Sequence, residues 1–416
     1  MAFLEYLPDE LLLQTFSYLL PTDLNSASRV SRHINNITTP LLYNEPWLIT
    51  SDQDPTDMHF FIRTLLTPGC ESLATHVRHL HLDWISEPTP PSHSDDSLLK
   101  CAARRFGLGN RSMTESAQVI LLLHLLPQLH TLNLFPPEEC DEFHDFMESF
   151  TTPQPITIFP IAFQSLRKYD CQRDISDNFL WTMMLLNLMR LPHIEFIRIP
   201  ACNGLYFGDL KALITAEASS TVTHLELTTA RVTPAVLSII LKIPQRLTHF
   251  ALYHCGGGMN HDFHALRSAL DPLRSSLTSL VIHYQTNQTR VTHRSKPSIT
   301  IGSLRDWPVL RSVKCSLLPI LGKRLPGESR EIASLLPACI HELEILNDHL
   351  WTMEEAVCVA LVLVGQKQSM LQGLRRLAVY SGRGGDWEMR ERLSNACVQA
   401  GVENVEDVDD CLFADE

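Results

Sequence analysis

Apolar residues recur along most of the chain in one short pattern, Leu-x-x-Leu-x-Leu, in which other large apolar residues or Cys can replace Leu. The first copy is Val77-Arg-His-Leu80-His-Leu82. Nine further copies begin at Leu129, Leu166, Ile194, Val222, Leu247, Leu277, Leu310, Ile340 and Leu374. A single copy also fits a helix, but nine copies spaced 25 to 37 residues apart are typical of a structural repeat. Alternation at period 2 predicts that each copy is a β-strand.

Helical patterns lie between the copies, at residues 116–126, 178–191, 234–243 and 353–367. Several of the stretches before a copy end in proline, at Pro127, Pro192, Pro244 and Pro337. Proline does not continue a helix interior, so it marks the corner between helix and strand. One strand and one helix for every ~30 residues predict a right-handed α/β solenoid. A doubly wound sheet is the competing layout, but it would not repeat the same pattern ten times.

Residues 77–385 resemble the leucine-rich-repeat family in this arrangement. The spacing is longer and less regular than is usual there, and the Asn or Cys that normally follows the strand is present only at Cys202 and Cys255. The predicted fold class is therefore α/β, a short all-α head followed by a right-handed leucine-rich-repeat-like solenoid with the horseshoe shape that the resemblance implies.

The first fifty residues instead follow the 3.6-residue period of three short amphipathic helices. We expect the first to begin after Leu7-Pro8 and to end at Pro21, the second to be capped by Thr22, and the third by Ser31. Their apolar positions are Leu11, Leu12, Thr15, Phe16, Leu19, Leu20, Leu24, Ala27, Val30, Ile34, Ile37 and Leu41. Three such helices bury too little surface to be stable alone. Their remaining apolar surface needs the rest of the chain or a partner.

Five spaced elements of this head resemble an F-box: Leu7-Pro8-x-Glu10-Leu11, Tyr18-Leu19, Asp23-Leu24, Val30-Ser31-Arg32 and Pro46-Trp47-Leu48. The resemblance covers residues 4–48 and departs from the family at Asn35-Asn36, where a Trp is frequent. F-box domains bind a Skp-family adaptor that connects them to a cullin-RING ubiquitin ligase. The resemblance implies adaptor-facing or adaptor-supporting positions at Leu7, Pro8, Leu11, Leu19, Leu24 and Val30. The alternative is an ordinary helical cap on the following domain.

Alternation within the strands also predicts which side chains face outward. Leu80 and Leu82 point into the solenoid, and His79, His81 and Asp83 point to a concave surface. The same rule gives the row Thr131, Lys168, Arg198, His224, Glu226, His249, Tyr253, His283, Lys314, Glu342, Glu344, Arg376 and Tyr380. A row of this kind suits a protein partner, although most of its members could be solvated strand residues. From residue type alone, we expect target-binding anchors at His224, His249, Tyr253, Arg376, Tyr380 and Trp387.

The charge of the chain indicates which kinds of partner do not suit it, and its cysteines indicate the compartment. With 47 acidic and 34 basic residues, the net charge is -13, which argues against dedicated nucleic-acid binding and against anionic membranes. Residues 393–416 hold seven acids and no Lys or Arg, so the other residues carry -13 + 7 = -6, and basic and phosphorylated targets both remain open. Eleven cysteines form no C-x-x-C pair, and the N-terminus shows no secretory signal pattern. We therefore expect a reducing compartment, the cytoplasm or the nucleus.

Three groups of residues have side chains that could support chemistry. A Gly-rich turn follows His254-Cys255, with His261 and His264 downstream, but it lacks the H-E-x-x-H or G-x-S-x-G partner that a hydrolase needs. His76, His79 and His81 lack cysteine or carboxylate support for a metal, and residues 382–386 lack the spacing of a phosphate-binding loop. We expect no catalytic site, no metal and no cofactor.

The sequence thus predicts an adaptor-docking domain at residues 1–50, a connector at 51–76, the solenoid at 77–392 and an acidic tail at 393–416. Residues 87–96 and 286–298 are expected to be polar surface loops. The predicted function is target recognition within an SCF-type ubiquitin ligase, with the head on a Skp-family adaptor and the concave face on a protein target. The alternative is a non-catalytic leucine-rich-repeat scaffold with no role in ubiquitin transfer.

Overall fold

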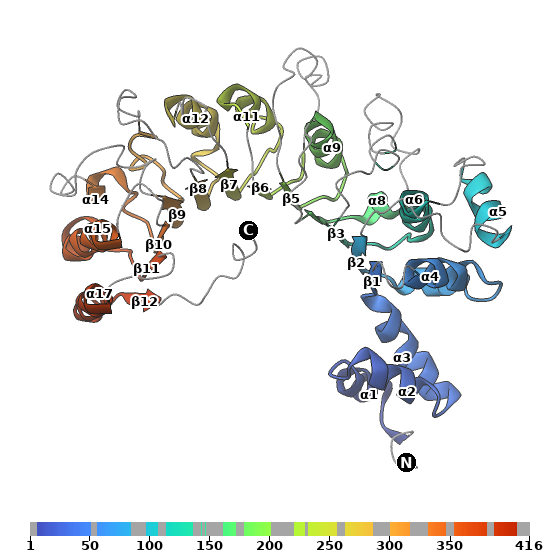
Figure 1. Cartoon of the computed structure of the whole chain (residues 1–416). Coiled ribbons are helices and arrows are strands. Elements are labelled where there is room, and N and C mark those ends of the chain that lie inside the picture. The colour runs from blue at the N-terminus through green and yellow to red at the C-terminus, as the bar shows by residue number, and fades with distance from the viewer. Residues whose placement is uncertain are drawn as a thin grey trace. The chain divides into compact units, whose positions relative to one another are not determined.

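The computed structural model describes residues 6–50, 56–84, 97–106, 114–135, 143, 146, 161–171, 179–200, 220–228, 232–255, 263–285, 300–316, 332–346, 353–380 and 387–405. The chain divides into two compact units, Met1–Ile199 and Pro200–Glu416. Within each unit, parallel strands lie side by side and the helices between them cover one face of the strands (Figure 1).

The first unit begins with three helices, α1 (Asp9–Phe16), α2 (Pro21–Ser28) and α3 (Arg32–Asn44). Its strands are β1 (Trp47–Thr50), β2 (His79–Trp84), β3 (Thr131–Phe135), β4 (Lys168–Cys171) and β5 (Phe196–Pro200), each parallel to the next. The intervening helices are α4 (Thr56–Leu66), the 3-10 helix η2 (Glu71–His76), α5 (Ser97–Arg105), α6 (Glu115–Leu125), α8 (Ile161–Ser165) and α9 (Phe179–Met189).

The second unit repeats the arrangement. Its strands are β6 (His224–Thr228), β7 (His249–Cys255), β8 (Ser279–Gln285), β9 (Ser312–Ser316), β10 (Glu342–Leu346), β11 (Arg376–Tyr380) and β12 (Glu403–Val405). Adjacent strands pair in parallel and in sequence order. The helices are α11 (Pro234–Ile240), α12 (Phe263–Leu270), the 3-10 helix η4 (Asp271–Leu273), α14 (Ile332–Leu335), α15 (Met353–Gly365), α16 (Lys367–Met370) and α17 (Trp387–Ala400).

All ten predicted strands form, and the predicted α/β repeat fold is confirmed. The apolar positions of the pattern are buried throughout; Leu80, Leu132, Ile197, Leu225 and Leu377 have no exposed surface. Their register explains the regularity, because Leu80 pairs with Leu132 and Leu225 with Phe250. Each repeat thus places its strand leucines beside those of its neighbours, which closes a core that a single repeat could not bury.

The residue just before each strand also holds the repeats together. The Arg78 carbonyl accepts hydrogen bonds from the N–H groups of His130 (2.7 Å) and Thr131 (2.9 Å). The Arg311 carbonyl accepts from His341 (2.7 Å) and Glu342 (2.9 Å) in the same way. In these pairs the two strands therefore begin at the same height.

Several local expectations need correction. Pro21 is the first residue of α2 and does not end α1, and the residue at the N-cap is Leu20, so Thr22 does not cap the helix. A proline in the first helical turn lacks an N–H that would be unpaired there anyway. The helical stretch expected at 178–191 runs over Phe179–Met189, and the one at 234–243 over Pro234–Ile240.

Strands β1 and β12 were not predicted, because neither carries the repeat pattern. β1 is formed by the last residues of the head motif, and β12 follows α17, which ends in a Schellman turn at Gly401 with φ +64°. The segment predicted as a connector contains α4 and η2. The loops at 87–96 and 286–298, residues 382–386, Cys202, and most of the predicted acidic tail (residues 406–416) lie outside the described residues.

Candidate interaction surfaces

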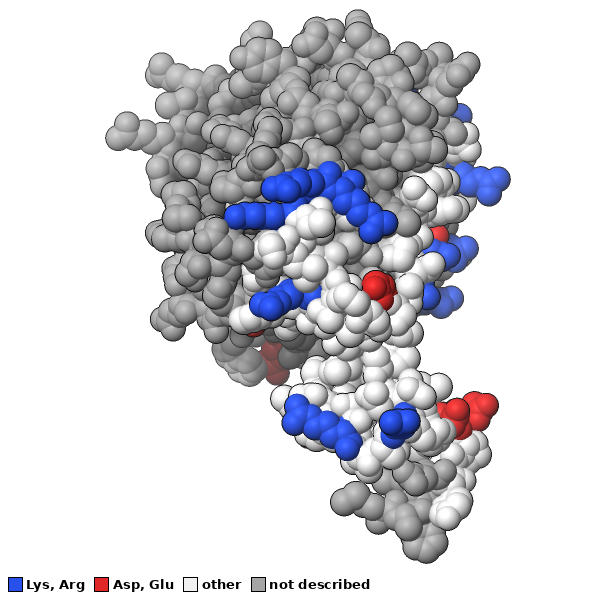
Figure 2. Space-filling model, turned by 90° about the vertical axis from the view of Figure 1, so that its right-hand side faces the viewer, with Lys and Arg blue, Asp and Glu red and all other residues white. Residues whose placement is uncertain are grey.

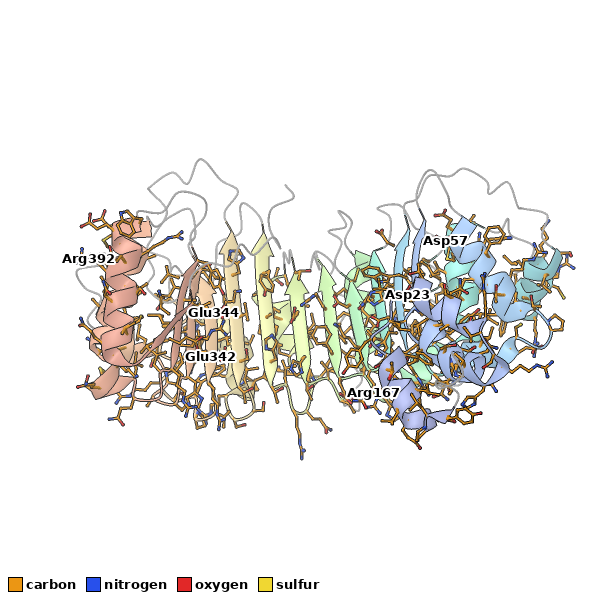
Figure 3. All side chains as sticks on the ribbon, turned by 90° about the horizontal axis from the view of Figure 1, so that it is seen from below. Asp23, Asp57, Arg167, Glu342, Glu344 and Arg392 are labelled. Atoms are coloured by element: carbon orange, nitrogen blue, oxygen red, sulfur yellow. The ribbon has the colours of Figure 1, made fainter. Side chains whose placement is uncertain are left out.

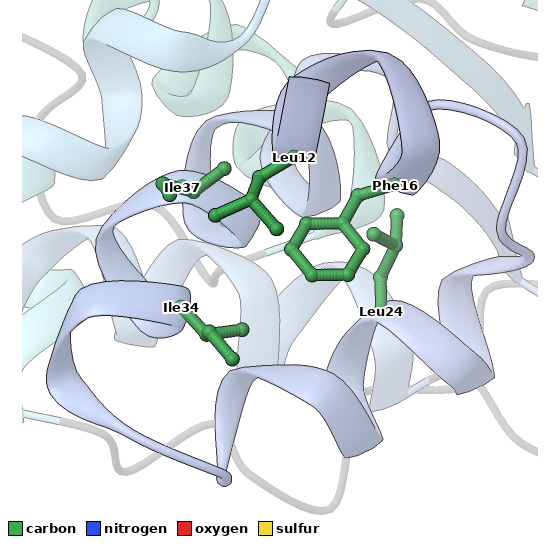
Figure 4. Packing of buried hydrophobic residues seen from close by; sticks show 5 residues of the cluster. All are labelled: Leu12, Phe16, Leu24, Ile34 and Ile37. Carbon is green, nitrogen blue, oxygen red and sulfur yellow. The ribbon is translucent and has the colours of Figure 1, made fainter. Parts of the chain in front are cut away.

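The three head helices pack around a small apolar core of their own (Figure 4). Its buried members are Leu12, Phe16, Leu24, Ile34 and Ile37, contributed by all three helices. Leu19, Ala27, Leu41 and Leu42 cover its margin. Two of the predicted adaptor residues, Leu24 and Leu19, therefore support the head from within. The described members of this cluster all lie between positions 12 and 42, so the head has a core separate from that of the strands.

Helix α3 has a side-chain cap at its N-terminus and a surface contact with α1. The Ser31 hydroxyl accepts a hydrogen bond from the N–H of Ile34 at 3.3 Å, which confirms the predicted cap. The buried Thr38 hydroxyl donates to the carbonyl of Ile34 at 2.9 Å. On the surface, His33 Nε2 lies 3.3 Å from Asp9 Oδ1 and connects α3 with α1. Caps of this kind typically contribute about 1 kcal/mol each to a short helix.

The other predicted adaptor residues lie on the outside of the head. Leu7, Leu11 and Val30 are 39%, 48% and 50% exposed, and Pro8 is also exposed. Of the six predicted adaptor positions, four are therefore exposed, and the other two, Leu19 and Leu24, pack in or against the head core.

Four more apolar side chains of the head are exposed and were not chosen from the sequence: Tyr6, Leu13, Tyr18 and Leu20. Seven of the eleven exposed large hydrophobic residues of the described chain lie between positions 6 and 30. Much of the described head surface accordingly carries neither Lys or Arg nor Asp or Glu, as the lower part of Figure 2 shows. The head sequence contains more apolar residues than a five-residue core can bury, and this excess could have predicted the exposed ones. Such a concentration of apolar surface marks an interaction site.

The strand face of the first unit carries a continuous polar row. In register across four strands are His81, Asn133, Asp170 and Arg198. His81 Nε2 lies 2.8 Å from a carboxylate oxygen of Glu45, so this nitrogen donates. The Asn133 amide then donates to His81 Nδ1, also at 2.8 Å.

Asp170 is the buried charge of this row, since its side chain is 2% exposed. Two cations balance it, Lys168 Nζ at 3.2 Å and Arg198 at 3.4 Å. Both cations also lie over the ring of Phe196, with Lys168 Nζ 4.8 Å and Arg198 Cζ 5.7 Å from its centroid. A buried carboxylate needs such partners, because an unpaired charge is costly in a low-dielectric site.

The strand face of the second unit is built from cross-strand pairs. His224 and His249 stack with their ring centroids 5.4 Å apart, and His249 Nε2 lies 3.6 Å from Glu226 Oε1. Further along, Lys314 Nζ lies 3.3 Å from Glu344 Oε2 and 4.8 Å from the ring centroid of Tyr380. Figure 3 looks onto this face and labels Glu344 on β10.

The predicted target-binding residues do not all come together. His224, His249 and Tyr253 lie on β6 and β7, where Tyr253 also contacts His283 edge-on with ring centroids 6.0 Å apart. Arg376 and Tyr380 lie on β11, four strands further along than β7. Trp387 is 72% exposed, but it begins helix α17 and is not a strand residue. Whether any of these six contacts a target stays a prediction.

Comparison with known proteins identifies the head. Residues 4–48 match the F-box-like family. The chain carries an F-box-like domain. A comparison with curated proteins found no match. Among solved structures, the leucine-rich repeat-containing protein LegL7 from Legionella pneumophila is similar, at 13% identity and a TM-score of 0.40, over 86% of this chain and 89% of that one.

The F-box-like domain runs directly into the first strand. β1 pairs with β2, placing Trp47 opposite His81, and their rings meet edge-on at 5.1 Å. The carbonyl of Asn44, at the end of α3, accepts a hydrogen bond from the N–H of Arg78 at 3.0 Å. The Glu45–His81 contact described above spans the same junction. Helix α3 and the strands of the first unit are thus fixed together by backbone and side-chain contacts.

The described residues bear on the metal, membrane and thiol features expected from the sequence. They contain no group of three or more His, Cys, Asp or Glu side chains placed to hold a metal ion. His76 lies in η2, while His79 and His81 share one face of β2. Within the same residues, the helices are too short or too polar to span a bilayer. The seven cysteines described are free thiols.

Proposed function

We propose that this chain is the target-recognition subunit of an SCF-type ubiquitin ligase. Its F-box-like domain binds a Skp-family adaptor, and the strand face of its repeats binds the target protein. The observation that carries the proposal is the packed three-helix head, which lies within the match to the F-box-like family at residues 4–48 and leaves Leu7, Leu11 and Val30 exposed. The cytoplasm or the nucleus is the proposed location, as the free thiols suggest.

The exposed apolar residues supply the driving force for docking. Burying a leucine or valine side chain completely is worth about 1.5–3 kcal/mol. Leu7, Leu11 and Val30 are already half buried or more, so they contribute part of that amount each. Leu24 and Phe16 beneath them fix the helices that present this surface. A pre-formed apolar surface loses little conformational entropy on binding.

In this proposal the chain performs no chemistry of its own. It holds a target beside the transferring enzyme, and the resulting high effective concentration accelerates ubiquitin transfer. The proposed target surface is the strand face, with His224, His249, Tyr253, Arg376 and Tyr380 as contact residues. Trp387 can take part only from the side of α17.

Co-expression with a Skp-family adaptor tests the first half of the proposal. Wild-type chain should co-purify with the adaptor in stoichiometric amount. Leu11→Glu should reduce the co-purified adaptor at least about tenfold, because the docked surface would bury an unpaired carboxylate. The control is Val398→Glu, which places the same charge on an apolar and more exposed position of α17. A folded wild-type chain that captures no adaptor would refute the proposal.

The scaffold alternative is favoured by one observation, the direct connection of α3 to β1. If the head is only a cap, removing it should destabilise the repeats. A chain lacking residues 1–28, with Ile34→Gln and Ile37→Gln to solubilise the exposed side of α3, distinguishes the two. Loss of cooperative unfolding supports the cap. An unchanged melting temperature of the repeats, together with loss of adaptor binding, supports the docking domain.

A further inference from the structure

The amino-terminal edge of the second unit is a surface of its own. Because the strands are parallel, the turns that precede them lie along one edge, the lower one in Figure 3. The residue just before β9, β10 and β11 is Arg311, His341 and Arg375 in turn. Backbone hydrogen bonds connect these three directly, from His341 N–H to the Arg311 carbonyl (2.7 Å) and from Arg375 N–H to the His341 carbonyl (2.8 Å). Neighbouring strands lie ~4.8 Å apart, so the three side chains occupy successive rungs.

Basic residues are concentrated along this edge. The turns before β7 to β11 hold six exposed cations, which we call the basic edge: Lys242, Arg246, Arg274, Arg305, Arg311 and Arg375. The same described turns hold two carboxylates, Asp271 and Asp306. Six positive charges against two negative ones leave an excess of four, in a chain whose net charge is -13.

Both carboxylates are already engaged by a seventh cation, Arg267 of α12. Its Nε donates to Asp271 Oδ1 at 2.8 Å and its Nη2 to Asp306 Oδ1 at 2.9 Å. The hydrogen bond from Arg267 is the main reason that the pKa of Asp306 lies below its usual value, so this carboxylate stays ionised. Of the basic edge, Arg274 has a distant ion pair with Asp306, at 3.9 Å. Within the described residues, the remaining cations of the edge have no ion pair.

The adjacent strand face has the opposite sign. It carries Glu226, Glu342, Glu344 and Glu403 against Lys314 and Arg376, so four negative charges face two positive ones. Lys314 already pairs with Glu344. The second unit therefore separates charge between its edge and its face. A partner that covers the edge must bring negative charge to complement it.

We propose that the basic edge binds an acidic segment of a protein partner. A nucleic acid is a poorer fit, because the edge offers no exposed aromatic platform for bases: its Trp307 is fully buried and covered by Arg267, whose guanidinium lies 5.0 Å from the ring. A membrane is a poorer fit as well, since the exposed large hydrophobic residues described in this unit, Trp387 and Val398, both lie on α17. This inference concerns a surface other than the head and does not depend on adaptor binding.

Fluorescence anisotropy with defined peptides tests the proposal on the full chain. The probe is a labelled twelve-residue peptide with six glutamates separated by serine or glycine, and its counterpart has glutamine in place of glutamate. We expect the glutamate peptide to bind at least about tenfold more tightly at low salt, with the difference shrinking as salt screens the charges. Arg311→Glu combined with Arg375→Glu should weaken its binding at least about tenfold. Arg311→Lys with Arg375→Lys should keep it within about twofold, because the charge is retained.

The controls distinguish binding at the basic edge from non-specific electrostatic attraction of the peptide to the chain. Arg63→Glu with Arg104→Glu makes the same charge change on α4 and α5 of the first unit, and it should leave binding of the peptide unchanged. Circular dichroism melts check that the variants are folded. The proposal is overturned if both reversals weaken binding equally or if the glutamine peptide binds as well. It is also overturned if a twelve-nucleotide RNA binds the edge more tightly than the peptide. A last contrary outcome is that a chain ending at residue 405 binds the peptide more than tenfold better, because residues 406–416 would then be the occupant of the edge.

Discussion

The head and the repeats use apolar residues in opposite ways. In the repeats, strand leucines pair in register with the apolar residues of neighbouring strands, and residues such as Leu132 and Leu225 have no exposed surface. The head has one small core, around Phe16, and leaves Leu11 and Val30 half exposed. Both regions are rich in leucine, so composition does not separate them. What separates them is whether a neighbouring element in the same chain covers the apolar side.

This difference follows from how each region buries its apolar residues. A repeat is completed by the next repeat, so the array is stable through its own nearest-neighbour contacts. Three short helices cannot bury all of their apolar surface among themselves. The head therefore leaves part of its apolar surface exposed within the described residues, while the repeats present polar and charged side chains on their strand face.

The largest expected effect breaks the head without breaking the repeats. Phe16→Ala removes the largest side chain of the head core and should cost about 3–5 kcal/mol. That loss exceeds what so small a core can supply, so α1–α3 should lose amide protection in hydrogen exchange. The described strands, from β2 onward, should keep theirs. Equal loss of protection in head and strands would mean that the two regions share one cooperative core.

The converse change acts on the repeats. Leu132→Ala in β3 leaves a cavity in a fully buried site and should cost about 2–5 kcal/mol in urea unfolding. Because neighbouring repeats support one another, the loss should spread to β2 and β4, the paired strands. The matched control is Thr131→Ala on the strand face, expected within about 0.5 kcal/mol of wild type. A local loss confined to β3 would contradict coupling between repeats.

A smaller effect is expected where the array ends. Lys367 Nζ donates to the carbonyls of Ala400 and Gly401, at 2.7 and 2.8 Å, and satisfies the end of α17 before β12. Lys367→Met should leave these carbonyls without the ammonium and cost about 1–3 kcal/mol, seen as faster exchange of the β12 amides. Lys242→Met, at an exposed position, should leave those amides unchanged. If both variants behave alike, the Lys367 contact does not hold the terminal strand.

The smallest expected effect concerns pH. The ring of His124 stacks on Phe106 with centroids 5.0 Å apart, and burial lowers the pKa of this histidine below its ordinary value. The folded state then keeps it neutral while the unfolded chain takes up a proton, so stability falls as the pH drops below about 6.5. His124→Phe should flatten part of this loss in melts between pH 8 and 5.

Part of the pH dependence of stability should persist in the His124→Phe variant. The pKa of His130 is also lowered, chiefly by burial and then by the nearby Arg78 and Arg167. A steeper fall of stability in His124→Phe than in wild type would contradict the assignment.

Much of the architecture could be predicted from local patterns. Period 2 in each repeat copy located all ten strands, and prolines marked the corner between helix and strand before four of them. β1 and β12 were not predicted, because their residues carry no repeat pattern and form strands by pairing with β2 and β11. The six predicted adaptor residues were chosen by resemblance, and the sequence could not tell the exposed Leu11 from the buried Leu24. Trp387 was grouped with strand residues by type, although a helix presents it.

The sequence by itself determined the repeat, its strands, and the helical head, because a hydrophobic period is a local property of the chain. Tertiary structure alone decided which residues of different repeats meet. Asp170 obtains two cations, Glu45 reaches His81, and Arg311 and Arg375 join one basic edge because parallel strands in register bring distant positions to the same height. Such neighbours depend on packing between repeats, which no local period encodes.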